Sequence, residues 1–490
     1  MKATFNILIL LTMTTIQAQS KMKIEQIYTG CMAHAAYYLE SDGEAAIFDP
    51  LREVSPYIEK AQKDNAKIKY IFETHFHADF VSGHLDLAKK TGGQIVYGPT
   101  AKPSFESIIA TDNQEFKVGK YTVKAIHTPG HTLESTCYLL FDENNQMHGI
   151  ITGDTLFIGD VGRPDLAQKL VSDLTQEKLA SYLFHSLRNK IMPLPDDLIV
   201  YPNHGAGSAC GKNMSKETTD TLGNQKKTNY ALRANMTEQE FISEVLEGLS
   251  APPAYFPQNV MMNIQGYESL DAVMKKGNHP LSAQEFKEIA QQSEALILDV
   301  RSEQEYIKSH IPRSIFIGLK GQFAPWVGAL IKDTQQPILL VVSKGHEEEA
   351  VTRLSRVGFD HTLGYLEGGI ESWINAGFET DAVHSISAEI FKNQHQNEKV
   401  IDVRKPSEYI SEHIIGAVNI PLDDFNSHLN EFPKDETFYV HCQGGYRSLI
   451  MASILKSRGF HHLINVEGGF VALKKSGVAA SPYICPSQIK

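Results

Sequence analysis

The sequence predicts a protein of several α/β domains, and three observations support this. At 490 residues the chain is too long for a single hydrophobic core. In its first part, short runs of β-branched and aromatic residues alternate with polar stretches of helical character. A sequence pattern of domain length then occurs twice. With 42% apolar and 21% charged residues, the composition is that of a folded globular chain.

The N-terminal residues carry the one targeting signal that the sequence predicts. Lys2 precedes an apolar run over residues 5–16 that is too short to span a bilayer, and Ala18 provides a cleavage position. We therefore expect a signal peptide over residues 1–18 and a periplasmic or secreted protein. Translation from Met22 is the alternative, and it would give a cytoplasmic protein. No other stretch approaches membrane-spanning length, so we expect no integral membrane segment.

The charge balance excludes one class of partner. The chain has 46 basic and 58 acidic residues and a formal net charge of −12, which provides no basic surface for a phosphate backbone. We expect no nucleic-acid partner. Five cysteines are too few for a disulfide scaffold, and their odd number leaves at least one free thiol.

The first predicted domain covers residues 23–249 and is rich in strands. Each of its apolar runs is short, and a turn residue or a potential metal ligand follows nearly every one. The runs are residues 45–48, 70–72, 94–97, 121–126, 137–141, 149–151 and 198–201. The proline-rich stretch over residues 250–257 cannot extend a helix, and we expect residues 250–279 to form a linker.

The remainder of the chain is an internal repeat. The segment Leu298-Asp-Val-Arg301 recurs as Ile401-Asp-Val-Arg404 at an offset of 103, and Glu367-Gly-Gly369 recurs as Glu467-Gly-Gly469 at an offset of 100. Two related α/β domains therefore follow the linker, over residues 280–380 and 385–480.

Candidate metal ligands follow four predicted strands of the first domain. His75, His77 and Asp79 lie on the loop after residues 70–72, and later strands end near three further candidates, His131, Asp154 and His204. Strand ends at one edge of a sheet lie close in space, so these side chains can converge. Nitrogen and carboxylate ligands without thiolate suit zinc, iron or manganese.

This pattern resembles the metallo-β-lactamase superfamily, whose signature is His-x-His-x-Asp-His with a later His, Asp and His. The resemblance covers about residues 23–249 and implies an αββα sandwich. Phe80 stands where the signature has its last histidine, which is a ligand of the second metal in dinuclear hydrolases. The departure favours the mononuclear branch, the persulfide dioxygenases.

In that branch the resemblance implies one Fe(II) per chain, held by His75, His131 and Asp154. Two histidines and one carboxylate leave coordination positions open for O₂ and a substrate sulfur. His77, Asp79 and His204 would orient the ligands or a bound water through hydrogen bonds.

Two further residues are candidates for substrate handling in the same domain. The resemblance implies that Arg163 grips a carboxylate of the thiol carrier, although a structural ion pair with Asp165 or Asp160 is the alternative. Cys210 lies six residues after His204, so its thiol could shuttle sulfur; the alternative is a small buried structural cysteine.

The second repeat carries a predicted nucleophile. Its apolar run 438–440 ends in His441-Cys442-Gln-Gly-Gly-Tyr-Arg447, a Gly-rich loop that opens a predicted helix. Backbone N–H groups, the helix terminus and Arg447 would stabilise a thiolate or persulfide at Cys442. The segment resembles the rhodanese sulfurtransferases over about residues 385–477, which implies an α/β domain with a parallel sheet.

The first repeat keeps this scaffold and lacks the nucleophile. Its loop runs from Val342 to Glu349, and no cysteine occurs between Cys210 and Cys442. The three successive glutamates at 347–349 would also repel an anionic sulfur donor. We expect a pseudo-rhodanese that spaces and docks its neighbours; a further role for Ser343 or His346 stays open.

Together these resemblances imply a persulfide dioxygenase fused to a rhodanese. It would oxidise a low-molecular-weight persulfide with O₂ to sulfite and thiol, and Cys442 would join sulfane sulfur to sulfite as thiosulfate or run this transfer in reverse. One alternative is a zinc-dependent thioester hydrolase of glyoxalase-II type fused to rhodanese. Another is a sulfur-carrier or docking protein without catalysis. Formation of a homo-oligomer is compatible with each.

Overall fold

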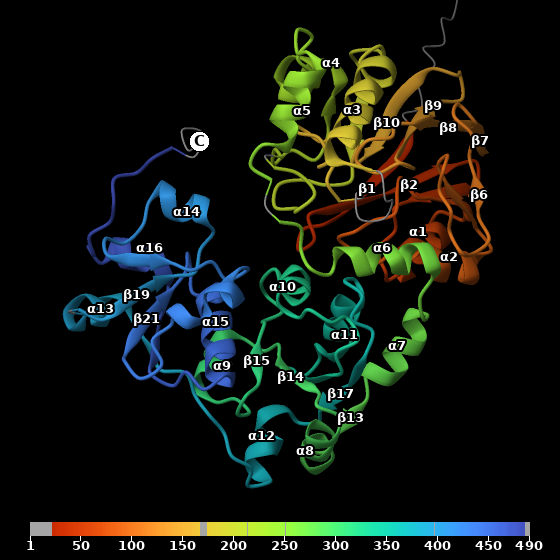
Figure 1. Cartoon of the computed structure of the whole chain (residues 1–490). Coiled ribbons are helices and arrows are strands. Elements are labelled where there is room, and N and C mark those ends of the chain that lie inside the picture. The colour runs from red at the N-terminus through yellow and green to blue at the C-terminus, as the bar shows by residue number, and fades with distance from the viewer. Residues whose placement is uncertain (1–21, 167–173, 213, 250, 396, 486–490) are drawn as a thin grey trace, which may run out of the picture.

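The computed structural model contains three domains in chain order (Figure 1). It describes residues 22–166, 174–212, 214–249, 251–395 and 397–485. The expected signal peptide over residues 1–18 lies outside the described residues. Among the helices of the described part, none is long and apolar enough to cross a membrane.

The first domain is built on two six-stranded sheets packed face to face. The first has the order β1-β2-β3-β4-β5-β6 and the second the order β12-β11-β10-β9-β8-β7. The strands of the first sheet are β1 (Lys23–Thr29), β2 (His34–Ser41), β3 (Glu44–Phe48), β4 (Lys67–Phe72), β5 (Gln94–Tyr97) and β6 (Ile108–Ile109). Those of the second are β7 (Glu115–Val118), β8 (Tyr121–His127), β9 (Thr136–Phe141), β10 (Met147–Gly153), β11 (Ile199–Pro202) and β12 (Asp220–Thr221).

Aromatic side chains from both sheets form the core between them. Phe72 of β4 stacks on Phe48 of β3 at 4.8 Å between ring centroids, and Tyr138 of β9 lies at 4.8 Å from Phe72. All three are buried, so their burial holds the sheets together. Helices cover the outer faces: α1 (Ser55–Lys63), α2 (His84–Thr91), α3 (Gln176–Ser186), α4 (Leu222–Thr228) and α5 (Glu238–Leu246), with short turns η2 (Leu187–Ile191) and η3 (Tyr230–Leu232). This confirms the predicted αββα sandwich.

The two repeats each contain a five-stranded parallel sheet, as predicted. Their strand orders correspond, β13-β17-β16-β14-β15 in the first and β18-β22-β21-β19-β20 in the second. The first repeat contains β13 (Pro280–Leu281), α8 (Ala283–Gln292), β14 (Leu296–Asp299), α9 (Glu303–Lys308), β15 (Ile315–Phe316), α10 (Phe323–Leu330), β16 (Ile338–Val341), α11 (Glu347–Ser355), β17 (Thr362–Leu366) and α12 (Gly369–Asn375). The second contains β18 (Ser385–Ile386), α13 (Ala388–Gln394), β19 (Lys399–Asp402), α14 (Pro406–Ser411), β20 (Ala417–Asn419), η4 (Phe425–Glu431), β21 (Phe438–His441), α15 (Tyr446–Ser457), β22 (Leu463–Val466) and α16 (Gly469–Lys475).

The segment 250–279, which the sequence predicts to be a linker, contains two helices, α6 (Phe256–Gln265) and α7 (Leu270–Gly277). Pro257 lies in the first turn of α6, where a missing N–H costs no helical hydrogen bond. Pro257 is therefore compatible with the start of this helix. Tyr255 and Phe256 are buried, and α6 packs between the first domain and the first repeat (Figure 1).

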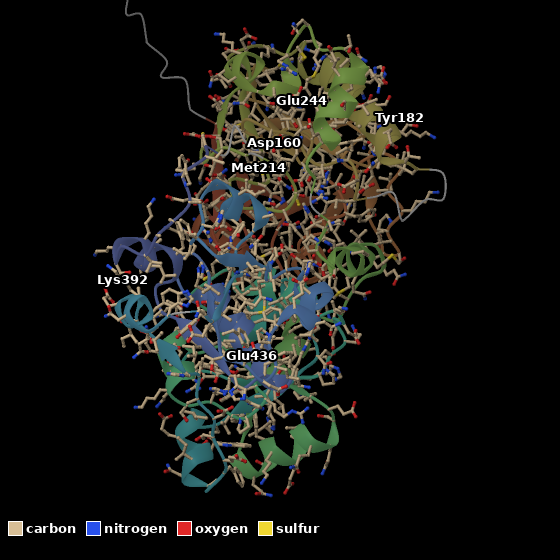
Figure 2. The ribbon with its side chains drawn as sticks, turned by 60° about the vertical axis from the view of Figure 1, so that its left-hand side comes forward. Asp160, Tyr182, Met214, Glu244, Lys392 and Glu436 are labelled. Atoms are coloured by element: carbon tan, nitrogen blue, oxygen red, sulfur yellow. The ribbon has the colours of Figure 1, made fainter. Side chains whose placement is uncertain are left out.

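The two repeats touch through α15, the helix that follows the Cys442 loop. Ser453 of α15 accepts a hydrogen bond from the backbone N–H of Phe316 at 3.0 Å, and the Tyr446 hydroxyl donates to the carbonyl of Gly318 at 2.7 Å. Figure 2 shows the second repeat, marked by Lys392 and Glu436, below the first domain, marked by Tyr182 and Glu244.

Candidate metal centre and sulfur-transfer loop

His75, His131 and Asp154 converge at one edge of the sandwich, as the sequence predicts. His75 follows β4, His131 lies between β8 and β9, and Asp154 directly follows β10. One potential ligand atom from each lies within 4.8 Å of the others, and all three side chains are buried. Both carboxylate oxygens of Asp154 lack a hydrogen-bond partner among the described residues. A buried anion of this kind fits a metal ion held by two imidazoles and one carboxylate.

Hydrogen bonds fix the two imidazoles in a ligating orientation. Nδ1 of His131 donates to the backbone carbonyl of Arg163 at 2.9 Å, and Nδ1 of His75 lies 3.0 Å from the Thr74 hydroxyl. The Nε2 atoms face Asp154, at 3.4 Å for His131 and 3.9 Å for His75. Burial, together with the neighbouring imidazoles, lowers the pKa of His75 well below its usual value, which favours the neutral form that binds metals.

Asp79, His204 and Cys210 form a second group beside the first. Nε2 of His204 lies 3.5 Å from both Asp79 and Asp154, while its Nδ1 bonds the carbonyl of Ala33 at 3.1 Å. The Cys210 sulfur lies within the same 4.8 Å limit. Asp79 and His204 lie where they could orient a bound water, and the donor atoms of the group also suit a second cation.

His77 is engaged by carboxylates. Its Nε2 lies 2.9 Å from Asp49 Oδ1 and 3.4 Å from Glu73 Oε2, and all three side chains are fully buried. Although burial opposes protonation, the two carboxylates raise the pKa of His77 well above its usual value. His77 therefore holds the loop by ion pairing. This ion pair could not be predicted from the sequence, because Asp49 follows a separate strand, β3.

Phe80 fills the position of the missing histidine with a buried ring. Its centroid lies 4.3 Å from that of His77 and 4.3 Å from that of His34. Its phenyl ring supplies no ligand atom.

Arg163 makes a structural ion pair. Its guanidinium binds Asp165 through Nε and Nη2, both at 2.7 Å, and its side chain is only 3% exposed. This geometry corresponds to the structural alternative that the sequence left open. The residue still contributes to the metal centre, because its carbonyl orients His131.

Cys210 is also buried, and the surroundings oppose its ionisation. Burial first, then the charges of Asp79 and Asp154, raise the pKa of the Cys210 thiol well above its usual value. Its position beside the candidate metal centre agrees with the sequence expectation, and the raised pKa disfavours the thiolate. The backbone of its loop is fixed by Asp160, which accepts from the Lys212 N–H at 2.7 Å (Asp160 is labelled in Figure 2).

A largely apolar pocket of about 440 Å³ opens beside His131. Phe76, Leu133, Val260 and Ile264 provide apolar walls, and Lys102 is the basic residue besides histidine in the described lining. Two of these side chains come from α6, the helix in the expected linker. Of the three candidate metal ligands, His131 lines this pocket.

Helix α6 also holds the loop that follows β4 and carries His75. The amide of Asn263 donates to the carbonyls of His77 and Phe80, both at 2.8 Å, and accepts from the N–H of Ser82 at 2.9 Å. Asn263 is thus a positioning residue that the sequence analysis missed, because it lies far downstream in a segment with no recognisable motif.

In the second repeat, Cys442 lies directly after β21 on the predicted Gly-rich loop. The N–H of Gly445 donates to its sulfur at 3.1 Å, and a φ of 111° at Gly445 permits this approach. Cys442 is only 1% exposed. Arg447 is bound by Glu408 through two contacts at 2.6 and 2.9 Å, so its charge is fixed close to the loop.

In the first repeat, strand register places Val342 at the position of Cys442. Val341 pairs with Asp299 as His441 pairs with Asp402, and the next residue is Val342 in one copy and Cys442 in the other. Five residues later, Glu347 stands where the second repeat has Arg447, and its carboxylate accepts from the Gly345 N–H at 2.8 Å. The first repeat therefore contains neither the thiol nor the adjacent cation.

Comparisons with known proteins agree with this domain order. A model of the metallo-beta-lactamase superfamily matches residues 29–204, and a model of the rhodanese-like domain matches residues 282–376 and 387–476. The solved structure of a metallo-beta-lactamase from Staphylococcus aureus subsp. aureus COL is 32% identical with a TM-score of 0.64, and the match covers 70% of this chain and 98% of that one.

Curated relatives match about a third of the chain. A probable hydroxyacylglutathione hydrolase from Schizosaccharomyces pombe is 30% identical over 183 residues, which are 36% of this chain and 66% of that protein. The hydroxyacylglutathione hydrolase of Rhizobium etli is 36% identical over 169 residues, which are 34% of this chain and 58% of that protein. The chain thus spans less than two thirds of the length of these relatives.

Proposed function

Because the chain belongs to the metallo-beta-lactamase superfamily and continues into two rhodanese-like domains, we propose that it oxidises a low-molecular-weight persulfide and couples this reaction to sulfur transfer at Cys442. The observation that carries the proposal is the buried set His75, His131 and Asp154. A set of two histidines and one carboxylate is typical of non-heme Fe(II) oxygenases.

The overall reaction would be RSSH + O₂ + H₂O → RSH + SO₃²⁻ + 2 H⁺. His75, His131 and Asp154 would hold Fe(II), which would supply the redox chemistry needed to react O₂ with the terminal sulfur. The chain's own residues provide the rest. The carbonyl of Arg163 and the hydroxyl of Thr74 keep both imidazoles aimed at Asp154, and His204 can hold a water between Asp79 and Asp154.

The pocket beside His131 would receive the organic part of the persulfide. Its apolar walls exclude water from the reacting sulfur, and Lys102 can pair with an acidic group of the thiol carrier. Lys102 replaces Arg163 as the residue that we assign to this contact, since Arg163 is already bound by Asp165.

The second half-reaction would occur at Cys442. A persulfide on its sulfur transfers sulfane sulfur to sulfite, so that Cys-S-S⁻ + SO₃²⁻ gives Cys-S⁻ + S₂O₃²⁻. The S–S bond breaks, a new S–S bond forms to sulfite, and the released thiolate accepts the hydrogen bond from Gly445. Arg447, which Glu408 holds at the loop, would partly offset the charge of the approaching anion.

The deciding experiment combines metal analysis with O₂ uptake. Protein purified without oxygen should contain one iron per chain and consume O₂ with glutathione persulfide. Asp154→Ala should lose both properties, because it removes the anionic ligand. Asp142→Asn, in the exposed turn between β9 and β10, is the matched control and should retain them. Zinc occupancy with thioester hydrolysis and no O₂ uptake would contradict the proposal.

A second candidate is thioester hydrolysis, which the names of the curated relatives favour. Asp79, His204 and Cys210 offer ligand atoms for a second ion, as a dinuclear hydrolase needs. Against it, Phe80 provides no ligand and His77 is bound by Asp49 and Glu73. A Cys210→Ser variant separates the two, since it should lower total metal only if a second ion is held.

A further inference from the structure

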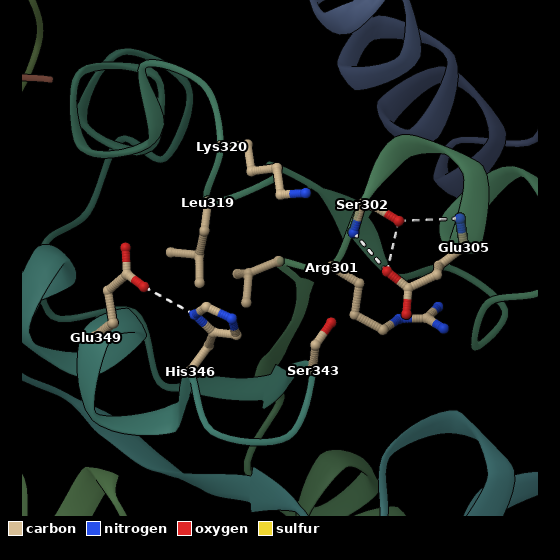
Figure 3. Close-up of a pocket in the computed structure, with 9 residues that line it drawn as sticks. Arg301, Ser302, Glu305, Leu319, Lys320, Ser343, His346 and Glu349 are labelled. Carbon is tan, nitrogen blue, oxygen red and sulfur yellow. Dashed lines mark hydrogen bonds and ion pairs between the residues drawn. The ribbon is translucent and has the colours of Figure 1, made fainter.

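The first repeat contains a cavity of about 410 Å³ beside its altered loop (Figure 3). Arg301 lies at the end of β14, Lys320 reaches over the cavity from the segment before α10, and Ser343 and His346 come from the loop after β16. The cavity occupies the side of the domain where the second repeat carries its sulfur-transfer loop.

The carboxylates of this cavity already have partners. Glu305 accepts from the backbone N–H of Ser302 at 3.0 Å, and Glu349 accepts from His346 Nδ1 at 2.9 Å and from Arg353 at 3.0 Å. Glu347 and Glu348 do not line it. The three glutamates expected to repel an anion therefore do not face this cavity together.

The hydrogen-bond donors of the cavity are available. Among the described residues, the Lys320 ammonium, the Ser343 hydroxyl and the Nη1 group of Arg301 make no hydrogen bond. In the second repeat the equivalent Arg404 uses Nη1 to bind the Gln443 side chain at 3.0 Å. Ser343 occupies the position of Gln443 and is too short for this contact, which leaves the guanidinium edge open to a ligand.

We propose that the first repeat binds a small sulfur oxyanion of the sulfite or thiosulfate class in this cavity. Two cations and a hydroxyl with unused donors match the acceptor oxygens of such an anion. The choice of a sulfur oxyanion, rather than another anion, rests on the proposed function.

The location supports that choice. Lys320 lies between Leu319 and Gly321, whose carbonyls accept hydrogen bonds from Arg353. Tyr446 packs against Gly321 and donates to Gly318, and it follows Cys442 by four residues. Lys320, which lines the cavity, is therefore adjacent in sequence to Gly321, the residue that contacts Tyr446. Tyr446 belongs to the Cys442 loop region, which would use or release sulfite.

The test is calorimetric titration of the full chain, freed of metal and carrying Cys442→Ser. Thiosulfate and sulfite are titrated separately, with inorganic phosphate as the comparison anion. Lys320→Gln should weaken binding of the sulfur anions by roughly tenfold or more, as for loss of a charged hydrogen bond. Lys344→Gln is the matched control, because Lys344 is exposed on the loop that carries Ser343 and His346 and does not line the cavity.

The proposal is overturned if Lys320→Gln leaves the affinity unchanged, or if Lys344→Gln lowers it equally. Phosphate binding as tightly as thiosulfate and sulfite would overturn the assignment to sulfur anions. Ser343→Ala, which should cost a few-fold, provides a second variant. The titration uses metal-free protein, so its result does not depend on O₂ uptake. A failure of O₂ uptake by the iron-loaded protein would refute the proposed function and leave the result of the titration unaffected.

Discussion

The two rhodanese-like domains share one scaffold and differ in what surrounds a single loop. Each keeps a buried aspartate–arginine pair at the end of a corresponding strand, Asp299 with Arg301 after β14 and Asp402 with Arg404 after β19. Each also keeps a glycine of positive φ in the loop, at 89° for Gly345 and 111° for Gly445. The scaffold and the loop conformation therefore do not determine whether the domain can carry sulfur.

The two loops differ in the group that accepts the hydrogen bond from the backbone N–H of this glycine. In the second repeat the Gly445 N–H donates to the Cys442 sulfur, whereas in the first the Gly345 N–H donates to the Glu347 carboxylate. Glu347 thus supplies an anion of the chain itself where Cys442 would hold a sulfur anion. A functional loop therefore needs a thiol, a free backbone N–H donor and a positively charged side chain at the position of Arg447.

The largest expected effect follows from removing the thiol. Cys442→Ser should lower sulfur transfer at least about a thousandfold, because a hydroxyl is far less acidic and less nucleophilic than a thiol. O₂ consumption at the metal centre should stay at its wild-type rate, and the product should shift from thiosulfate toward sulfite. Ion chromatography of the products measures this shift.

Cys210 provides the control for that experiment, since its thiol lies beside the metal centre. Single and double variants with Cys210→Ser should be compared. Thiosulfate formed at the wild-type rate by the double variant would show that neither thiol carries sulfur, and the division between the two domains would be lost.

A smaller loss is expected when the cation of the active loop is removed. Arg447→Gln should reduce sulfur transfer from thiosulfate by roughly 10- to 100-fold, as for loss of a charged hydrogen bond. Arg458→Gln, at the other end of α15, is the matched control. Steady-state kinetics with varied thiosulfate test this. An equal loss of activity in both variants would show that the charge of Arg447 has no specific role in sulfur transfer.

Much of this architecture could be predicted because the informative residues lie at strand ends. His75, His131 and Asp154 are far apart in sequence, yet each follows a strand of one sandwich, so topology alone brings them together. The Gly-rich motif after the apolar run 438–440 likewise identified the loop of Cys442.

The rest depended on contacts between segments with no shared motif. Asn263 holds the metal-binding loop from a helix expected to be a linker, and its amide has no sequence signature. Arg163 stood beside two acidic residues, and only geometry shows that Asp165 binds it. The equivalence of Val342 and Cys442 likewise required the strand register, because the loop sequences of the two repeats differ on both sides of this position.

The converse experiment restores the missing groups to the first repeat. Val342→Cys combined with Glu347→Arg, in a Cys442→Ser background, should raise sulfur transfer roughly tenfold above that background, since a thiol regains both an N–H donor and a cation. Val342→Cys alone should stay at background, because Glu347 still occupies the Gly345 N–H. Equal activity of the single and double variants would show that the charge at 347 is irrelevant.

The smallest expected effect concerns the contact that joins the repeats. Tyr446→Phe removes the hydrogen bond to the Gly318 carbonyl but keeps the ring packed on Gly321. Burial raises the pKa of Tyr446, so the phenol remains a donor at neutral pH. The variant should lose about 1 kcal/mol of stability, the usual net contribution of a neutral hydrogen bond, with sulfur transfer changed less than about threefold.

Gly321→Ala gives the matched test of that contact, because an added Cβ would overlap the Tyr446 ring and force the repeats apart locally. It should destabilise the chain by more than Tyr446→Phe, and thermal unfolding followed by tryptophan fluorescence measures both. The fluorescence reports chiefly on the first repeat, where Trp326 and Trp373 lie. If Tyr446→Phe abolished sulfur transfer while the melting temperature stayed unchanged, the first repeat would take part in the chemistry of its neighbour, and the contrast between an active and a silent domain would fail.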